Sequence, residues 1–162
     1  MNKKSLFVAL VALLISLPAL AQPTRQRQQG HELLFKLVGV WQQVEEVTDS
    51  TGNAMQLFLP HWKVLQGDGH FVNFLMPHPK APSFMTTDGH FRVVSDKYYS
   101  ERILNSLTNP DLKGVEVMME YTLDEEKGEM SLRFMLPNSD RPLREVWRKV
   151  RMEIPAQLQQ RP

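Results

Sequence analysis

The clearest pattern in the chain is an alternation of apolar and other residues in its last third. In the segment 115–123, large apolar side chains stand at every second position: Val115, Val117, Met119, Tyr121 and Leu123. In the segment 130–136, the same holds for Met130, Leu132, Phe134 and Leu136. A period of two indicates strands that bury one face. The polar run 124–128 predicts a turn, so the two segments are expected to pair as antiparallel strands.

Short apolar segments separated by turn residues fill most of the remaining chain. The tetrapeptide Asp-Gly-His-Phe occurs twice, at 68–71 and 88–91. Asp-Gly supplies the positive φ angles that a two-residue hairpin turn needs, so a turn is expected at each copy. The further expected strands are 38–47, 55–66, 70–76, 83–87, 90–95, 98–104 and 143–152.

These strands predict one all-β domain over residues 31–153. Eight to ten short strands with regularly spaced turns are typical of an antiparallel barrel or a sandwich. A short helical turn is expected over 31–36, before the first strand, and a second over 105–112. The polar segments 22–30 and 154–162 have little to bury and are expected to form a flexible leader and tail.

The first 21 residues have the layout of a cleaved secretory signal. Lys3 and Lys4 precede an uncharged apolar run at 6–17, and Ala19-Leu20-Ala21 puts small residues where a signal peptidase reads. The apolar run is too short to span a bilayer. We therefore expect cleavage between Ala21 and Gln22 and a periplasmic or secreted product without a transmembrane segment.

Composition narrows the partners of the mature chain. Residues 22–162 carry 17 basic and 18 acidic residues, a net charge of −1, which gives no general attraction to nucleic acid. The chain contains no cysteine, so disulfides and acylation of an N-terminal cysteine are excluded. We expect no cofactor. The oligomeric state does not follow from the sequence.

Several segments together resemble a known family. Gly39-Val40-Trp41, at the start of the first expected strand, resembles the Gly-x-Trp motif of lipocalins. The other segments are LPHWKVL (59–65), DGHFVNF (68–74), KAPS (80–83), TNP (108–110) with Gly114, and EVW (145–147). Over about residues 32–152 the chain is similar to a lipocalin-like family of secreted Gram-negative proteins, classified as a domain of unknown function. The resemblance implies an antiparallel lipocalin-like barrel and no particular activity.

The resemblance also implies structural roles for three residues. Gly39 allows a close approach of the backbone, and the Trp41 indole closes one end of the barrel. In lipocalins a basic residue of the last strand commonly lies over this indole, and Arg148 is the favoured candidate, with Arg151 as the alternative. A guanidinium over the indole contributes ~0.5–2 kcal/mol. In the competing interpretation both arginines are solvated on the outer face.

Alternation also predicts the wall of an internal cavity. Met119 and Tyr121 are expected to face inward beside Leu132 and Phe134 of the neighbouring strand. The candidate ligand-binding residues are Trp62, Phe74, Met119, Tyr121, Leu132 and Phe134. The leading hypothesis is non-catalytic binding of a small, mostly apolar ligand in the cell envelope or outside the cell.

Two other functions stay open at this point. One is a structural or protein- or glycan-interaction module with a solidly packed barrel. The other is an enzyme that uses an inward Glu and Tyr pair, for which one residue of Glu45-Glu46 is a candidate by alternation. The chain has no Gly-x-Ser-x-Gly elbow and no cysteine nucleophile, so no catalytic residue is assigned.

Histidines and methionines do not predict a metal site. His70 and His90 each follow a turn glycine and are interpreted as hairpin residues, because two ligands without a third are insufficient for a zinc site. The methionines are scattered over the expected strands, whereas thioether ligands of copper would cluster. They are interpreted as residues of an adaptable core or cavity.

Overall fold

The computed structural model describes residues 22–137 and 139–153. The expected signal at 1–21 and the expected tail at 154–162 lie outside these residues. The predicted cleavage between Ala21 and Gln22 therefore stays a prediction. Within the described residues, no helix is both long and apolar enough to cross a membrane.

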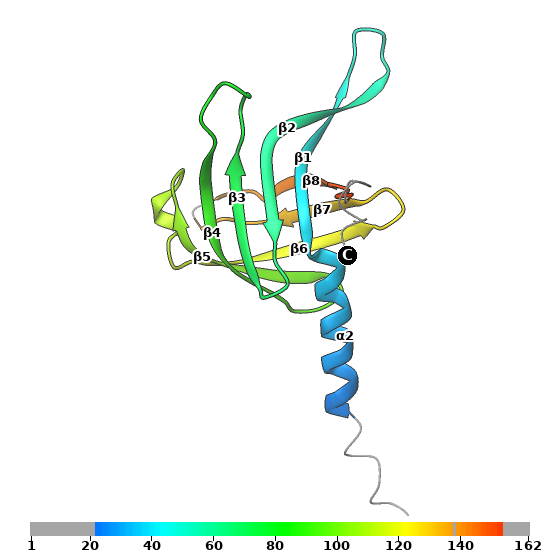
Figure 1. Ribbon diagram of the computed structural model, residues 1–162, viewed down its shortest axis with the longest axis vertical. Coiled ribbons are helices and arrows are strands. Elements are labelled where there is room, and N and C mark those ends of the chain that lie inside the picture. The colour runs from blue at the N-terminus through cyan, green and yellow to red at the C-terminus, as the bar shows by residue number, and fades with distance from the viewer. Residues whose placement is uncertain (1–21, 138, 154–162) are drawn as a thin grey trace, which may run out of the picture.

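Eight antiparallel strands form a closed barrel, which confirms the all-β barrel prediction (Figure 1). Each strand pairs with the next along the chain, and β1 pairs with β8 to close the ring. The strands are β1 (Gly39–Thr48), β2 (Ala54–Leu65), β3 (His70–Leu75), β4 (Phe84–Val93), β5 (Tyr98–Ser106), β6 (Glu116–Asp124), β7 (Glu129–Phe134) and β8 (Leu143–Lys149). Helix α2 (Gln22–Leu37) precedes β1, and the 3-10 helix η1 (Pro110–Leu112) lies between β5 and β6.

Helix α2 is longer than the single turn expected from the sequence. It has 16 residues and includes the segment 22–30, which was expected to be a flexible leader. Gln and Arg are good helix formers, and Pro23 suits a first turn, but the segment lacks the apolar periodicity that would reveal a helix. Only the last turns of α2 reach the barrel, where Leu37 is fully buried. Figure 1 shows the rest of the helix extending away from the strands.

The two Asp-Gly-His-Phe copies have different structures, which corrects the expectation of a hairpin turn at each. The Asp-Gly of the first copy ends the four-residue turn 66–69 between β2 and β3, where Gly69 has φ +86°. The second lies inside β4, so the expected strands 83–87 and 90–95 are one strand. Its glycine is needed for a close approach of β5, because a Cβ on Gly89 would lie 2.1 Å from the Arg102 carbonyl oxygen.

Strands β1 and β2 extend beyond the ring as a projecting hairpin (Figure 1). The pairing of β1 with β8 ends at Val44, and the pairing of β2 with β3 begins at His61. A register irregularity between Gln42 and Val44 bends the pair at this point. Such bulges turn a strand out of the sheet, so residues beyond the bend leave the barrel wall.

The tightest part of the core lies in the half of the barrel near α2. Its fully buried large side chains come from the helix and from five strands: Leu37, Trp41, Leu65, Phe71, Tyr99 and Met130. Trp41 is 1% exposed, so its indole is buried, as expected of a side chain that closes one end of the barrel. This half is filled by side chains, whereas the opposite half holds the cavity described next.

Candidate functional site

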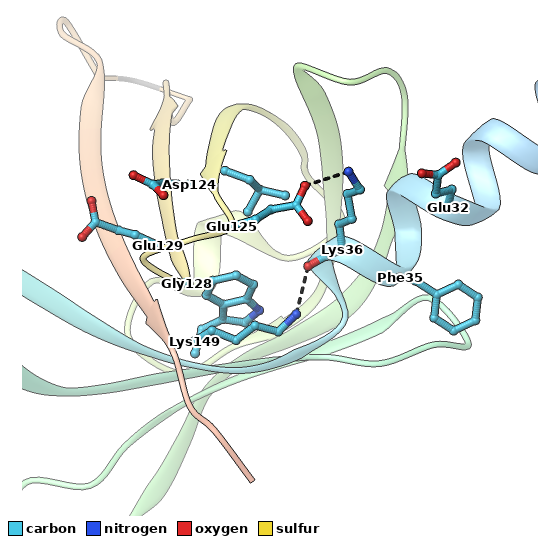
Figure 2. Close-up of a pocket in the computed structure, with 10 residues that line it drawn as sticks. Glu32, Phe35, Lys36, Asp124, Glu125, Gly128, Glu129 and Lys149 are labelled. Carbon is cyan, nitrogen blue, oxygen red and sulfur yellow. Dashed lines mark hydrogen bonds and ion pairs between the residues drawn. The ribbon is translucent and has the colours of Figure 1, made fainter.

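Helix α2 and β8 together close one end of the barrel around Trp41. The Trp41 Nε1 donates a hydrogen bond of 2.8 Å to the Leu37 carbonyl. The Lys149 Nζ lies 5.1 Å from the Trp41 ring and donates to the Lys36 carbonyl at 3.0 Å (Figure 2). The last carbonyls of a helix lack partners within the helix and attract positive charge. These two bonds therefore fasten the end of α2 to the barrel.

The residue over the indole is Lys149, which corrects the prediction of Arg148. Lys149 pairs with Trp41 across β1 and β8, whereas Arg148 pairs with Gln42 and faces outward. The Arg148 guanidinium donates to Gln56 Oε1 at 2.6 Å and to the Lys127 carbonyl at 3.2 Å. The alternative, Arg151, is exposed and follows the end of β8. The register of β8 against β1 decides which of the neighbouring residues 148 and 149 lies over the indole, and that register is not a local property of the sequence.

A groove of about 390 Å³ lies outside this closed end, between α2 and the β6–β7 turn (Figure 2). Its main interaction is the ion pair of Lys36 Nζ and Glu125 Oε1, 2.7 Å apart, with side chains that are 37% and 65% exposed. Exposed pairs of this kind contribute little free energy. The other charged residues described in its lining are also partly or largely exposed, so the groove differs from a specific site with buried polar groups.

A second hollow, of about 240 Å³, lies inside the barrel at the end away from α2. Of the six predicted cavity residues, four border it: Trp62, Phe74, Met119 and Phe134. Trp62 and Phe74 pair with each other and alternate with Lys63 and Asn73, so the strand pleat turns their side chains away from the face that carries those two residues. The expectation that Trp62 and Phe74 belong to the inner wall is therefore corrected, although both residues border the hollow. That any of the six binds a ligand stays a prediction.

The other two predicted residues, Tyr121 and Leu132, are buried but lie deeper, in the filled half of the barrel. Tyr121 pairs with Leu132, and this pair lies two residues nearer to the β6–β7 turn, and so nearer to α2, than the pair of Met119 and Phe134. The Tyr121 hydroxyl donates to the Ser95 carbonyl at 3.0 Å, away from the cavity. Alternation identified the inward face correctly, but it does not give the height of a residue along the barrel axis.

A buried ion pair forms the floor of the cavity. The Lys63 Nζ lies 2.5 Å from Glu101 Oε1, and the two side chains are 3% and 4% exposed. The Tyr99 hydroxyl donates to the same Glu101 oxygen at 3.1 Å. Burial and the neighbouring Glu101 carboxylate raise the pKa of Tyr99 well above its usual value. The Lys63 ammonium also lies 5.5 Å from the Trp147 ring, where the π face is attractive to a cation.

Glu145 and Asn73 add two polar groups to the cavity wall. Glu145 is half-buried, and its Oε2 accepts a 3.0 Å hydrogen bond from Trp147 Nε1. Burial raises the pKa of the Glu145 carboxyl, while the Lys63 ammonium opposes this shift. The Asn73 Oδ1 is buried and has no hydrogen-bond partner within the described residues.

Sequence reasoning missed the polar residues Lys63, Glu101, Asn73 and Glu145. A signal was present, since Lys63 and Leu65 share one face of a strand, as do Glu101 and Ile103. A charged residue that shares its strand face with a large apolar residue two positions away indicates a polar group within a core. By contrast, Glu45 and Glu46 are both exposed, so neither is the inward acid considered for an enzyme.

His70 and His90 pair across β3 and β4, with ring centroids 4.3 Å apart. The Nδ1 of His70 lies 3.0 Å from Asp68 Oδ2. In the part of the chain that the structure describes, no group of three or more His, Cys, Asp or Glu side chains is arranged to hold a metal. The methionines Met118 and Met119 lie on opposite faces of β6, one exposed and one buried.

Comparison with known proteins finds a family match over the barrel. The family model described as "Domain of unknown function (DUF4488)" matches residues 36–157. Among solved structures, the chain is similar to a redesigned beta barrel, with 16% identity and a TM-score of 0.41 over 76% of this chain and 96% of that chain. No curated protein matches the chain.

Proposed function

The chain belongs to the DUF4488 family, a domain of unknown function, and from its own interior we propose that it binds one small molecule in the barrel cavity without chemically changing it. The observation that carries this proposal is the internal hollow of about 240 Å³ above the Lys63–Glu101 pair. An apolar cavity of roughly 150 Å³ accepts benzene, and drug-sized ligands occupy roughly 300–1,000 Å³. The cavity therefore suits a ligand between these two sizes.

The lining of the cavity combines apolar and polar groups. Strands β5 to β7 and helix η1 supply the apolar Ile103, Leu112, Met119 and Phe134, and β8 adds Trp147. The polar groups are Lys63, Asn73, Glu101 and Glu145, from β2, β3, β5 and β8. Binding sites are typically mostly apolar, with a few placed polar groups that fix the orientation of the ligand. The expected ligand thus has an apolar body and at least one polar group, a refinement of the mostly apolar ligand expected from sequence.

The arrangement of the polar floor favours binding over catalysis. Lys63 and Tyr99 both donate to Glu101, and the Tyr99 phenol, whose ordinary pKa already lies well above neutral and is raised further by burial, is protonated near neutral pH. Neither group is therefore a free base or nucleophile. A buried ion pair adds little to stability compared with apolar residues of the same volume. The pair thus forms a polar floor beneath the space that a ligand would occupy.

Binding is tested with a small environment-sensitive apolar dye and paired substitutions on β6. Met119→Lys puts a charge into the cavity, whereas Met118→Lys puts the same charge at the preceding residue, on the exposed face of β6. We expect 1:1 dye binding to the wild type and to Met118→Lys, and loss of binding in Met119→Lys. Phe134→Trp fills the cavity without adding charge and should weaken binding while the fold, measured by circular dichroism, is unchanged. Equal dye binding by all four proteins would contradict the proposal.

A second candidate function is a protein-interaction module, and the projecting hairpin of β1 and β2 favours it. The edge of β2 before His61 has no strand partner among the described residues, and its apolar side chains Met55, Leu57 and Phe58 are exposed. An unpaired edge of this kind can receive an extended polypeptide as an additional strand. If no small molecule enters the cavity, loss of partner binding in Leu57→Lys with an intact barrel would support this alternative.

A further inference from the structure

We propose that the ligand of this cavity is a small amine, whose protonated nitrogen binds Glu145 while its apolar body lies against Met119 and Phe134. This inference deepens the proposed binding function and rests on it. It names the chemical class of the ligand and the residue that selects it.

The first argument is the balance of charges around the cavity. Among the described lining residues, Lys63 is the ammonium and Glu101 and Glu145 are the carboxylates. Lys63 lies 2.5 Å from Glu101, and Tyr99 donates to Glu101 as well. The one cation is thus committed to one carboxylate. His61, the remaining titratable lining residue, is exposed.

Glu145 is therefore the lining carboxylate that forms no ion pair among the described residues, although the Lys63 ammonium lies near enough to act on it. Its hydrogen bond within the described residues comes from the neutral indole N–H of Trp147, at 3.0 Å. Removal from water penalises an ionised carboxylate unless charge or hydrogen bonds compensate it. The raised pKa of Glu145 is the expected consequence of that incomplete compensation. A protonated nitrogen in the cavity would supply the missing charge.

Asn73 gives a second, independent indication that donors are missing. Its buried Oδ1 has no hydrogen-bond partner among the described residues, and such groups are rare in native structures. Asn73 pairs with Lys63 across β2 and β3 and lines the same cavity as Glu145. A primary ammonium has three N–H donors, so it can bond a carboxylate and still offer protons to a second acceptor.

The same charges disfavour an anionic ligand. A ligand carboxylate would enter a cavity in which two carboxylates face one ammonium that is already paired. Like charges at short distance in a poorly solvated site repel strongly. A neutral alcohol avoids this repulsion but leaves the Glu145 charge uncompensated. An amine is the class that satisfies both conditions.

The volume and the walls limit the rest of the ligand. About 240 Å³ exceeds the roughly 150 Å³ cavity that accepts benzene, so one aromatic ring with a short linker fits. The thioether of Met119 adapts to rings and contacts them favourably. Phe134 pairs with Met119 across β6 and β7 and completes an apolar wall. We therefore choose 2-phenylethylamine and 2-phenylethanol as matched probes of nearly equal size.

The experiment measures the dissociation constants of both probes by calorimetry, for the wild type and for two variants. We expect the amine to bind the wild type at least about tenfold more tightly than the alcohol, which corresponds to about 1.4 kcal/mol. Glu145→Gln keeps the shape and an acceptor for Trp147 but removes the charge, so the preference should disappear. Glu116→Gln makes the same change at a carboxylate that is 45% exposed on the outer surface of β6, so the preference should remain.

A pH series compares the wild type with Glu145→Gln. As the pH falls through the raised pKa of Glu145, the carboxylate gains a proton and the amine affinity of the wild type should fall, while alcohol affinity stays constant. His61 lines the cavity in both proteins, so the part of the fall that Glu145→Gln lacks belongs to Glu145. Equal binding of both probes at all pH values would overturn the amine assignment but leave the binding cavity. Binding of neither probe to the wild type would instead overturn the proposed function. A preference that survives in Glu145→Gln would show that another group selects the amine.

Discussion

The Lys149 side chain lies over the indole of Trp41, with its ammonium 5.1 Å from the ring centroid. It passes beside Gly39, which has no side chain to obstruct it. A Cβ on Gly39 would lie 2.8 Å from Lys149 Cε, and the φ angle of Gly39 is +147°. The glycine of the Gly-x-Trp motif is therefore explained by the lysine side chain that passes over it. The same lysine bonds the end of α2, so the motif fastens the helix to the barrel.

Gly39→Ala should destabilise the protein by about 1–3 kcal/mol, the usual cost of a residue held in a strained backbone region. The added methyl group would displace Lys149 from Trp41 and from the Lys36 carbonyl. Urea unfolding measures the change. Gly67→Ala is the matched control, because a Cβ there meets nothing within 4 Å. Equal unfolding midpoints for the two variants would contradict this explanation of Gly39.

Trp41→Ala should cost ~3–5 kcal/mol, because it removes a fully buried aromatic side chain and leaves a cavity. The change also removes the 2.8 Å hydrogen bond to the Leu37 carbonyl. Denaturant unfolding gives the free energy, and hydrogen exchange of the α2 amides reports whether the helix end is released. Unchanged protection of these amides would show that α2 is held without Trp41.

Lys63→Met should cost about 3–5 kcal/mol, because it leaves the Glu101 carboxylate buried without its cation. The double variant Lys63→Met with Glu101→Gln removes both charges and should recover a large part of this loss. A double-mutant cycle compares the free energies of unfolding in urea of the wild type, the two single variants and the double variant. If the double variant is as unstable as the sum of the single changes, the two residues are not coupled as the 2.5 Å contact implies.

The pH dependence of stability should report Glu145. Its folded-state pKa is raised from 4.5 by burial, so the folded state binds this proton more tightly than the unfolded state does. By linkage, its contribution favours folding below the unfolded pKa and is lost as the pH rises through the folded pKa. Glu145→Gln should therefore match the wild type in acid and become relatively more stable as the pH rises. Urea unfolding midpoints of both proteins, measured at pH values on the order of one unit apart from about pH 4 upward, test this. Parallel curves of midpoint against pH for the two proteins would contradict the raised pKa of Glu145.

Export and cleavage remain a prediction from the first 21 residues. The small residues Ala19 and Ala21 after a broken apolar run predict a mature N-terminus at Gln22. N-terminal sequencing of protein recovered from the cell envelope or the medium tests this. Exported protein that retains Met1 would refute the signal interpretation.

The sequence by itself determined the architecture and the faces of the last strands. Alternation put Met119, Tyr121, Leu132 and Phe134 inward on neighbouring strands, and the structure pairs Met119 with Phe134 and Tyr121 with Leu132. This works because the side-chain direction in a strand has a local period of two. The same method did not predict the helix over the polar segment 22–30, because a helix without an apolar stripe has no hydrophobic period to detect.

Only the tertiary structure decided which residues meet. The partners Lys63 and Glu101 are 38 residues apart, and Lys149 and Lys36 are 113 apart. Strand register sets these contacts, and a shift of one residue would bring Arg148 instead of Lys149 to Trp41. Height along the barrel likewise separates Met119, at the cavity, from Tyr121, in the core. Register and height are properties of the closed ring, so a local pattern in the chain does not contain them.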